Sequence, residues 1–226
     1  MDSNKRSWGL FRRRECPVPT IRGFAVLLFI AISLAVLAAR TVYPFLAVNS
    51  RVRDGVLVVE GWVPDYALEK TIAEFKRNHY SKLFVTGVPL DNGAPLSEYK
   101  TFAELGAATL IRLGFDTNTV QAVPAARVRA DRTYACAAAL KNWFLQNGIA
   151  ETNVNVITMG AHARRTRLLF SKALGKDCRI GVISLQSRSY DPHRWWESSE
   201  GVRTVIGEGI AYGYARLLFR PPAEAE

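Results

Sequence analysis

The chain has 226 residues, with 30 Lys and Arg against 20 Asp and Glu, and 49% of its residues are hydrophobic. That length predicts one domain, or one domain with an appendage, rather than two full domains, and the charged fraction of 22% excludes a disordered chain. Three cysteines exclude a disulfide scaffold. The net charge of +10 fits an anionic partner, which can be nucleic acid, a phosphate ligand or anionic lipid.

An apolar segment lies near the N-terminus. Residues 23–39, GFAVLLFIAISLAVLAA, contain no charged residue and are bracketed by Arg22 and Arg40. A helix of that length, at about 1.5 Å per residue, nearly crosses the hydrocarbon core of a bilayer. Ala38 and Ala39 would also suit the end of a cleaved signal peptide, but the apolar core of such peptides is only about 7–15 residues long. We therefore expect a transmembrane anchor at residues 23–39, with a cleaved signal peptide as the alternative.

The charges around this segment predict its orientation. Six basic residues precede it and three follow it at a comparable distance, namely Lys5, Arg6, Arg12, Arg13, Arg14 and Arg22 against Arg40, Arg51 and Arg53. By the positive-inside rule, the basic tail at residues 1–22 stays in the cytoplasm and the rest is extracytoplasmic. The tail can also bind nucleic acid, but beside an apolar span anionic lipid and topology explain it better. We expect a single-pass protein of the cell inner (plasma) membrane, with no nucleic-acid partner.

After a linker at residues 40–53, apolar runs alternate with amphipathic segments. The predicted strands are residues 56–60, 82–87, 119–123, 153–160 and 179–185, and the predicted helices are residues 65–79, 97–113, 131–146, 161–174 and 200–219. Strands that are apolar on both faces and separated by helices are typical of a parallel sheet with both faces covered. We predict a three-layer, Rossmann-like α/β domain at residues 54–219, with an open, mainly parallel five-stranded sheet and a short tail at 220–226.

The last predicted helix and the loop before it have unusual compositions. Five residues share one face of the helix, namely Val202, Ile206, Ile210, Gly213 and Leu217. Gly209 and Gly213 resemble a membrane dimerisation motif, but the helix is too polar to span, and close packing on the sheet is the better interpretation. In the loop, Tyr190, Trp195 and Trp196 form either a lid or lipid-interface contact, or a segment pinned by two buried tryptophans.

Ligands of an open parallel sheet bind beyond the carboxyl ends of its strands, at helix N-termini. Two of the loops at this edge are rich in basic residues, namely Arg127, Arg129 and Arg132 before the third helix, and His162, Arg164, Arg165 and Arg167 at the start of the fourth. Cations are unfavourable at a helix N-terminus, so their presence favours an anion site, and Arg suits phosphate or carboxylate. The alternative is a solvated surface on which Asp131 neutralises Arg132.

His162 has three possible roles: a general acid or base, a ligand contact, or a structural polar group. Its candidate partners are Glu60 and Asp131, which lie on neighbouring loops. The three histidines lack metal-ligand spacing, and the chain contains no GxSxG, P-loop or GxGxxG motif. We therefore expect no metal and no cofactor.

Five sequence elements together resemble the YdcF/SanA/ElyC family of bacterial envelope proteins. They are VVEGW at the first strand, TG after the second, DRTYACA at the third helix, TMGAHARRTRLLFSKALG across the fourth strand and helix, and WWESSEGVRTVIGEGIAY. The resemblance covers residues 54–218. Many members have a Gly-Gly pair after strand one and Ser-Gly-Gly after strand two, where this chain has Glu60-Gly61 and Thr86-Gly87-Val88. The chain therefore resembles a variant branch of the family.

The resemblance implies a Rossmann-like domain linked to cell-envelope integrity, peptidoglycan and lipid-carrier metabolism. One soluble member is associated with S-adenosylmethionine, a cytoplasmic cofactor that does not fit an extracytoplasmic domain. Carried over to this chain, the resemblance implies catalytic residues Glu60 and His162 and ligand-binding residues Gly61, Thr86, Gly87, Glu98, Asp131, Arg132, Thr133 and Arg165.

Two functions follow as expectations. The first is an enzyme on a phosphorylated glycan or polyprenyl-phosphate precursor, in which Arg132 and Arg165 hold the anion and His162 or Glu60 moves protons. The second is a non-catalytic domain that binds or senses such a lipid-linked precursor or a related anionic small molecule.

Cys136 and Cys178 are the cysteines beyond the predicted span. Cys136 lies early in the third helix and Cys178 precedes the fifth strand, so the two belong to opposite ends of the sheet. A strand of about six residues separates those ends by roughly 20 Å, whereas a disulfide needs Cα atoms within about 7 Å. We predict two thiols rather than a disulfide.

Overall fold

The computed structural model describes residues 18–150 and 152–222, and the chain divides into two compact units, Met1–Ala38 and Ala39–Glu226. Most of the predicted basic tail, including Cys16, and the last four residues of the predicted C-terminal tail lie outside the described residues.

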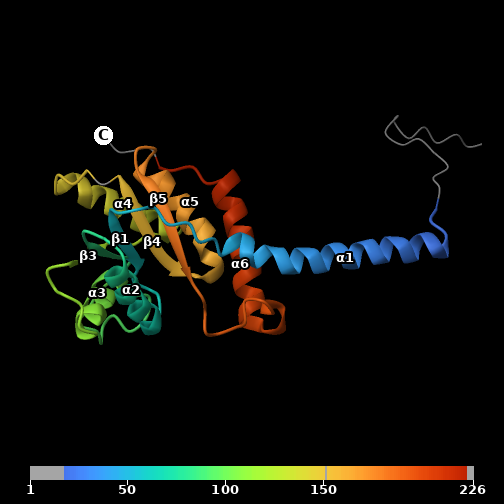
Figure 1. The fold of residues 1–226 in the computed structure, drawn as a ribbon, viewed down its shortest axis with the longest axis horizontal. Helices are drawn as coiled ribbons and strands as arrows, with labels where there is room; N and C mark the ends of the chain where they lie inside the picture. The colour runs from blue at the N-terminus through green and yellow to red at the C-terminus, as the bar shows by residue number, and fades with distance from the viewer. Residues whose placement is uncertain (1–17, 151, 223–226) are drawn as a thin grey trace, which may run out of the picture. The chain divides into compact units, whose positions relative to one another are not determined.

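The second unit is built on a parallel sheet. Its five strands lie in the order β3-β2-β1-β4-β5, and every neighbouring pair is parallel. This order has its switch point between β1 and β4, as in Rossmann-like domains. The predicted fold class is therefore confirmed (Figure 1). The strands are β1 (Val56–Glu60), β2 (Leu83–Gly87), β3 (Val120–Pro124), β4 (Asn153–Met159) and β5 (Arg179–Leu185).

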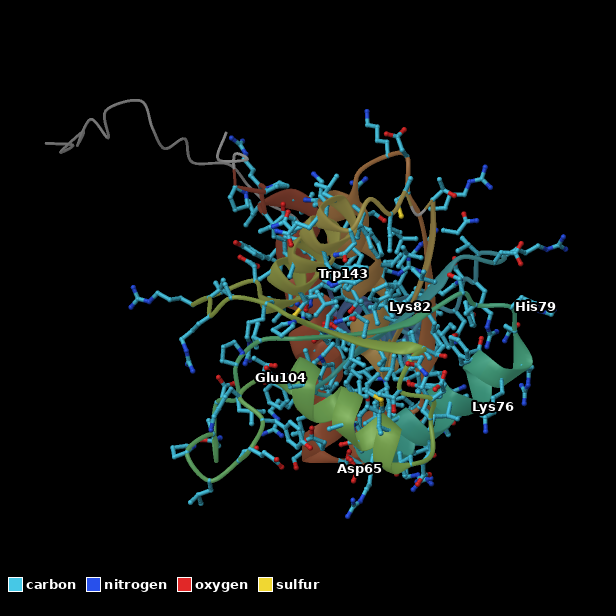
Figure 2. All side chains as sticks on the ribbon, turned by 90° about the vertical axis from the view of Figure 1, so that its left-hand side faces the viewer. Asp65, Lys76, His79, Lys82, Glu104 and Trp143 are labelled. Atoms are coloured by element: carbon cyan, nitrogen blue, oxygen red, sulfur yellow. The ribbon has the colours of Figure 1, made fainter. Side chains whose placement is uncertain are left out.

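Helices cover both faces of this sheet because alternate strand residues point to opposite sides. Leu57 and Val59 pack with α2 (Asp65–Arg77) and α3 (Phe102–Arg112) on one face. Val56 and Val58 pack on the other face. The helices of that second face are α4 (Arg132–Gln146) and α5 (Ala163–Leu174), and α6 (Ser199–Leu217) packs against α5. Figure 2 shows Asp65 and Lys76 of α2 and Glu104 of α3 in the same layer.

Helix α3 begins five residues later than the sequence pattern predicts, at Phe102. Thr101 accepts a hydrogen bond from the Glu104 amide, while the Glu104 carboxylate accepts one from the Thr101 amide. This capping box ends the loop and starts the helix at that point.

Helix α1 (Ile21–Leu46) contains the predicted anchor and is long and apolar enough to cross a membrane. It continues past the expected end at Ala39, into the segment that the sequence predicts as a linker. Within the second unit, Tyr43 and Leu46 pack against α6 and against the loop before it, which carries Tyr190, Trp195 and Trp196 and which we call the aromatic loop. The predicted linker is therefore folded onto the domain, and Ser50 pairs with β5 through Val182.

The aromatic loop was expected to be either an exposed contact surface or a segment pinned by buried tryptophans, and it has features of both. The Trp195 indole is buried and donates a 2.8 Å hydrogen bond to the Ala39 carbonyl, whereas Trp196 is exposed. Tyr190 is buried against Tyr43 with their rings edge to face. One tryptophan therefore pins the loop, through a short 3₁₀ helix, η2 (Trp195–Glu197), and the other is available to a partner.

Candidate functional site

A cavity of about 480 Å³, the site cavity, lies at the carboxyl ends of β1 and β2. The first turns of α3, α4 and the 3₁₀ helix η1 (Gly160–His162) surround it. This is the position at which open parallel sheets bind ligands. It is lined by Glu60, Trp62, Gly87, Val88, Asp91, Phe102, Asp131, Arg132, Thr133, Cys136, His162 and Arg165.

Two predicted glycines let helix α3 start close to the sheet. A Cβ atom on Gly61 would lie 2.2 Å from the Phe102 carbonyl oxygen, and one on Gly87 would lie 2.4 Å from the Ala103 amide nitrogen. Any side chain at either position would therefore displace α3. Gly87 lines the site cavity, whereas Gly61 acts by allowing this close approach.

Glu60, at the end of β1, is a buried carboxylate with 2% of its surface exposed. Its Oε2 atom accepts hydrogen bonds from the Thr158 hydroxyl and, at 3.4 Å, from the Thr166 hydroxyl. Burial alone would raise the pKa of Glu60, but the charge and hydrogen bond of His162 and the hydrogen bond from Thr158 lower it below its ordinary value. Glu60 is therefore an anion at neutral pH.

His162 lies between two carboxylates. Its Nε2 atom is 3.5 Å from Glu60 Oε1, and its Nδ1 atom is 2.9 Å from Glu208 Oε1. Burial would lower the pKa of the imidazole, but the two acids outweigh burial and raise it to about 9. The ring is therefore an imidazolium at neutral pH, and the edge of the Trp62 ring system packs against it with centroids 5.4 Å apart.

Arg165 completes this cluster by holding Glu208. Its Nε atom donates to Glu208 Oε2 at 2.8 Å and its Nη2 atom to Glu208 Oε1 at 2.9 Å. Nη2 also lies 2.9 Å from His162 Nδ1, but both nitrogens carry protons in the charged state, so Glu208 is the acceptor. Burial would raise the pKa of Glu208, yet its hydrogen bonds to Arg165 and His162 lower it to about 2. In this cluster the negative charges of Glu60 and Glu208 are thus balanced by the positive charges of His162 and Arg165.

The start of α4 forms the opposite wall. Arg132 pairs with Asp91 at 2.6 Å, and both side chains are more than half exposed. The Thr133 hydroxyl lies 3.4 Å from His162 Nε2. Asp131 is in the left-handed region, with φ of 55°, and its side chain does not cap the helix. Such strain in a residue other than glycine is typical of functional sites.

Several predicted residues do not come together here. Glu98 is exposed on the loop before α3 and does not line the site cavity, while Thr86 is buried beside it. Of the arginines, Arg127 and Arg129 are exposed outside the cavity wall. Arg164 stacks on Phe45, and Arg167 donates to the Ile180 carbonyl. The expected arginine cluster therefore reduces to Arg132 and Arg165.

The sequence pattern did not predict five residues of the site region, namely Glu208, Thr158, Trp62, Asp91 and Cys136. Glu208 could have been found as the one acidic side chain in the middle of an otherwise apolar and small-residue stretch. Burial and the charge of Glu60 raise the pKa of the Cys136 thiol to about 12, which makes it a poor nucleophile. The structure holds Cys136 and Cys178 as thiols, as predicted.

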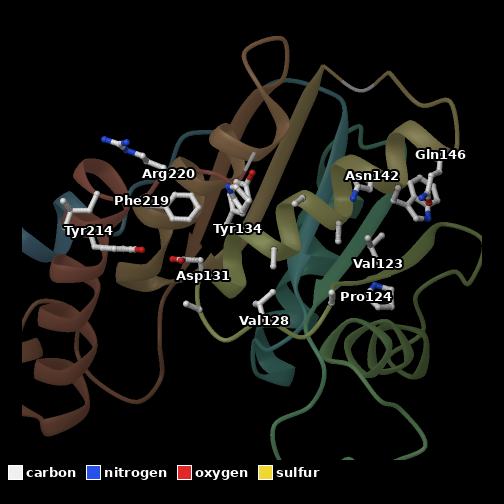
Figure 3. A pocket seen from close by; sticks show the side chains of 18 residues that line it. Val123, Pro124, Val128, Asp131, Tyr134, Asn142, Gln146, Tyr214, Phe219 and Arg220 are labelled. Carbon is white, nitrogen blue, oxygen red and sulfur yellow. The ribbon is translucent and has the colours of Figure 1, made fainter. Parts of the chain in front are cut away.

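Two other cavities border this region. The largest of those described, about 900 Å³, lies along α4 and is walled mainly by apolar side chains such as Tyr134 and Phe219 (Figure 3). A smaller one, about 300 Å³, shares Trp62 and His162 with the site cavity. The site cavity is the candidate because it combines Glu60, His162 and Arg132.

No group of three or more His, Cys, Asp or Glu side chains in the described part of the chain could hold a metal ion. Comparisons with protein-family models, curated proteins and solved structures found no match to this chain.

Proposed function

We propose that the chain is a membrane-anchored, extracytoplasmic domain of the YdcF family that binds a phosphate-bearing anion in the site cavity. The observation that carries this proposal is the convergence on one cavity of an imidazolium, an exposed arginine and the starts of three helices. Free amides and the partial positive charge at helix starts favour an anion. The proposed ligand is a phosphorylated glycan or polyprenyl-phosphate precursor used in cell-envelope biogenesis.

The roles of the two site arginines differ. Arg165 is half-buried and its guanidinium pairs with Glu208, so we assign it to stabilising the charged cluster rather than to the ligand. Arg132 pairs with an exposed partner, Asp91, and can exchange that carboxylate for a phosphate. We therefore assign anion contact to Arg132.

Catalysis is the first of two candidate activities. His162 Nε2 faces Glu60 and Thr133, and all three residues line the site cavity. A histidine with a pKa of about 9 is protonated at neutral pH and suits a general acid that donates a proton to a leaving oxygen. The second candidate, binding without turnover, uses the same cavity with His162 as a fixed positive charge.

The anion contact can be tested with inorganic pyrophosphate as the probe. In calorimetric titration of the detergent-solubilised full chain, we expect Arg132→Gln to weaken binding by about tenfold or more, the value of one charge-assisted hydrogen bond. Arg129→Gln is the matched control, because Arg129 is an exposed arginine on the same loop that does not line the site cavity. Equal affinities for wild type and Arg132→Gln would contradict the proposal.

A His162→Gln variant incubated with a polyprenyl pyrophosphate distinguishes catalysis from binding without turnover. If His162 is the acid, this variant loses product formation, read by mass spectrometry, and retains binding of the lipid. If the wild type forms no product from such lipids yet binds them, the non-catalytic activity is supported.

We propose that helix α1 remains attached as the anchor. The alternative cleavage point, Ala38–Ala39, lies inside a continuous helix, and Ala39 accepts the hydrogen bond from Trp195. We therefore expect the intact mass of the membrane-extracted protein to include residues 1–38. A mass corresponding to a chain that begins near Arg40 would contradict this.

The orientation is proposed on the charge asymmetry of the sequence. A reporter enzyme that is active only outside the cytoplasm, fused after Glu226, is expected to be active. Activity of a cytoplasm-specific reporter at the same position would reverse the topology.

A further inference from the structure

The outward face of α6 is apolar. Ile210 is 71% exposed and Leu217 is 82% exposed, although both are large aliphatic side chains. The exposed apolar residues along this helix and just after it form what we call the α6 stripe, namely Val202, Ile206, Ile210, Tyr214, Leu217 and Leu218. Exposed apolar patches of this extent mark interaction surfaces.

The inward face of the same helix carries an acidic residue, Glu208. Glu208 points into the domain and pairs with His162 and Arg165. The packing expected of Gly209 and Gly213 against the sheet is absent: a Cβ atom on Gly213 would meet no described atom within 4 Å, and one on Gly209 only Leu46 at 4.0 Å. The inward face thus combines Glu208 with the buried apolar residues Val205 and Ala215, while the domain leaves the larger side chains of the α6 stripe uncovered.

Basic and aromatic residues accompany the α6 stripe. Arg216 is exposed on the helix, Arg203 is exposed and pairs with Glu200, and Trp196 is 39% exposed just before it. Arginine next to apolar side chains, with tryptophan at one end, is typical of helices that lie in the headgroup region of an anionic bilayer. A contact between two protein copies requires no such basic border.

Within the second unit, helix α6 packs against the last residues of α1. The rings of Phe45 and Tyr212 meet at 5.7 Å, and Val205 is buried with Tyr43 and Leu46. The apolar span ends by sequence at Ala39, and at about 1.5 Å per residue Phe45 follows it by roughly 9 Å of helix. The α6 stripe therefore lies on a helix that contacts α1 less than two helical turns after the end of the apolar span.

We propose that the α6 stripe lies in the interface of an anionic bilayer. This inference rests on the proposal that α1 is a membrane anchor. Helix α6 then presents its apolar side to lipid while Glu208, on the opposite side, holds His162 and Arg165. Contact of α6 with the membrane would in this way stabilise the position of the helix that supplies Glu208 to the site.

The test uses the full chain in vesicles of phosphatidylcholine and phosphatidylglycerol. A background with Cys16, Cys136 and Cys178 replaced by alanine receives Ile210→Cys, or Leu145→Cys as the control, and an environment-sensitive fluorophore. Leu145 is matched because it is an aliphatic helix residue, 70% exposed, on α4. Lipids that carry a doxyl quencher near the headgroup report contact, since interfacial helices bury their apolar face about 5–10 Å deep.

We expect the probe at Ile210 to lose most of its emission and the probe at Leu145 to keep most of its emission. Quenching at Ile210 should weaken in vesicles of phosphatidylcholine alone, and unchanged quenching there would overturn the role of anionic lipid. Equal quenching at both positions, or at neither, would overturn the docking proposal. A probe at Ile210 that is shielded only at high protein-to-lipid ratios would instead assign the stripe to a second copy.

Flotation separates this result from failure of the anchor. If α1 does not anchor the chain, the protein does not float with the vesicles after washing with high salt and carbonate. If the protein floats and the probe at Ile210 is not quenched, the anchor stands and the docking proposal is wrong.

Discussion

Replacing Glu208 with alanine is expected to destabilise the domain by about 3–5 kcal/mol, because it leaves the largely buried Arg165 guanidinium without its carboxylate and removes one of the two carboxylates that face His162. The side chains of Arg165 and Glu208 are only 19% and 17% exposed, so water replaces little of the lost interaction. The measurement is urea unfolding of the detergent-solubilised chain, followed by tryptophan fluorescence.

The matched control is Glu197→Ala, which removes an exposed ion pair with Arg194. Its expected cost is below about 1 kcal/mol. The double variant Arg165→Met/Glu208→Leu removes both charges and is expected to cost less than Glu208→Ala, because neither ion is left unpaired. If Glu208→Ala costs no more than Glu197→Ala, the cluster is not a structural element of the domain.

Stability is expected to fall as the pH rises from about 6.5 to 9. The folded-state pKa of His162, about 9, lies above its ordinary value of 6.5, so the folded protein holds this proton more tightly than the unfolded chain. The stabilisation is fully present below pH 6.5 and is lost as the pH passes through 9. The difference corresponds to about 3 kcal/mol, at about 1.4 kcal/mol per pH unit.

A His162→Gln variant should remove this slope, because glutamine does not titrate. Unfolding free energies of both proteins at pH 6, 7, 8 and 9 provide the comparison. The lowered pKa of Glu208, about 2, acts in a separate window: its stabilisation is present above pH 4.5 and is lost toward pH 2. A wild-type profile that is flat between pH 6.5 and 9 would show that His162 is neutral in the folded domain.

The sheet could be predicted from the sequence because its strands are short, apolar on both faces and separated by helices. The runs VLVVE and RIGVISL coincide with β1 and β5, and the helices α2 to α6 were expected, whereas the short 3₁₀ helices η1 and η2 were not. Boundaries shifted where local hydrogen bonds decide them, as in the capping box of Thr101. The extension of α1 to Leu46 depends on tertiary contacts with Tyr190 and Trp195, which no local pattern contains.

The site was only partly predictable. The rule that ligands bind at the carboxyl ends of parallel strands found Glu60, His162, Arg132 and Arg165. It did not find Glu208, because an apolar helical face is normally read as the buried one. In α6 most of the large apolar residues face outward, and Glu208 enters the domain on the opposite side beside Val205 and Ala215. Contacts of this kind can be found only from the tertiary structure.

The most direct test of the central claim is native mass spectrometry of the full chain released from its membrane in mild detergent. If the site cavity binds a phosphate-bearing envelope precursor, the wild-type protein should carry a noncovalent phosphorus-containing adduct. The adduct should be lost or greatly reduced in Arg132→Gln and retained in Arg129→Gln. A bare wild-type protein, or an adduct retained equally by Arg132→Gln, would contradict the claim that this cavity is an anion-binding site.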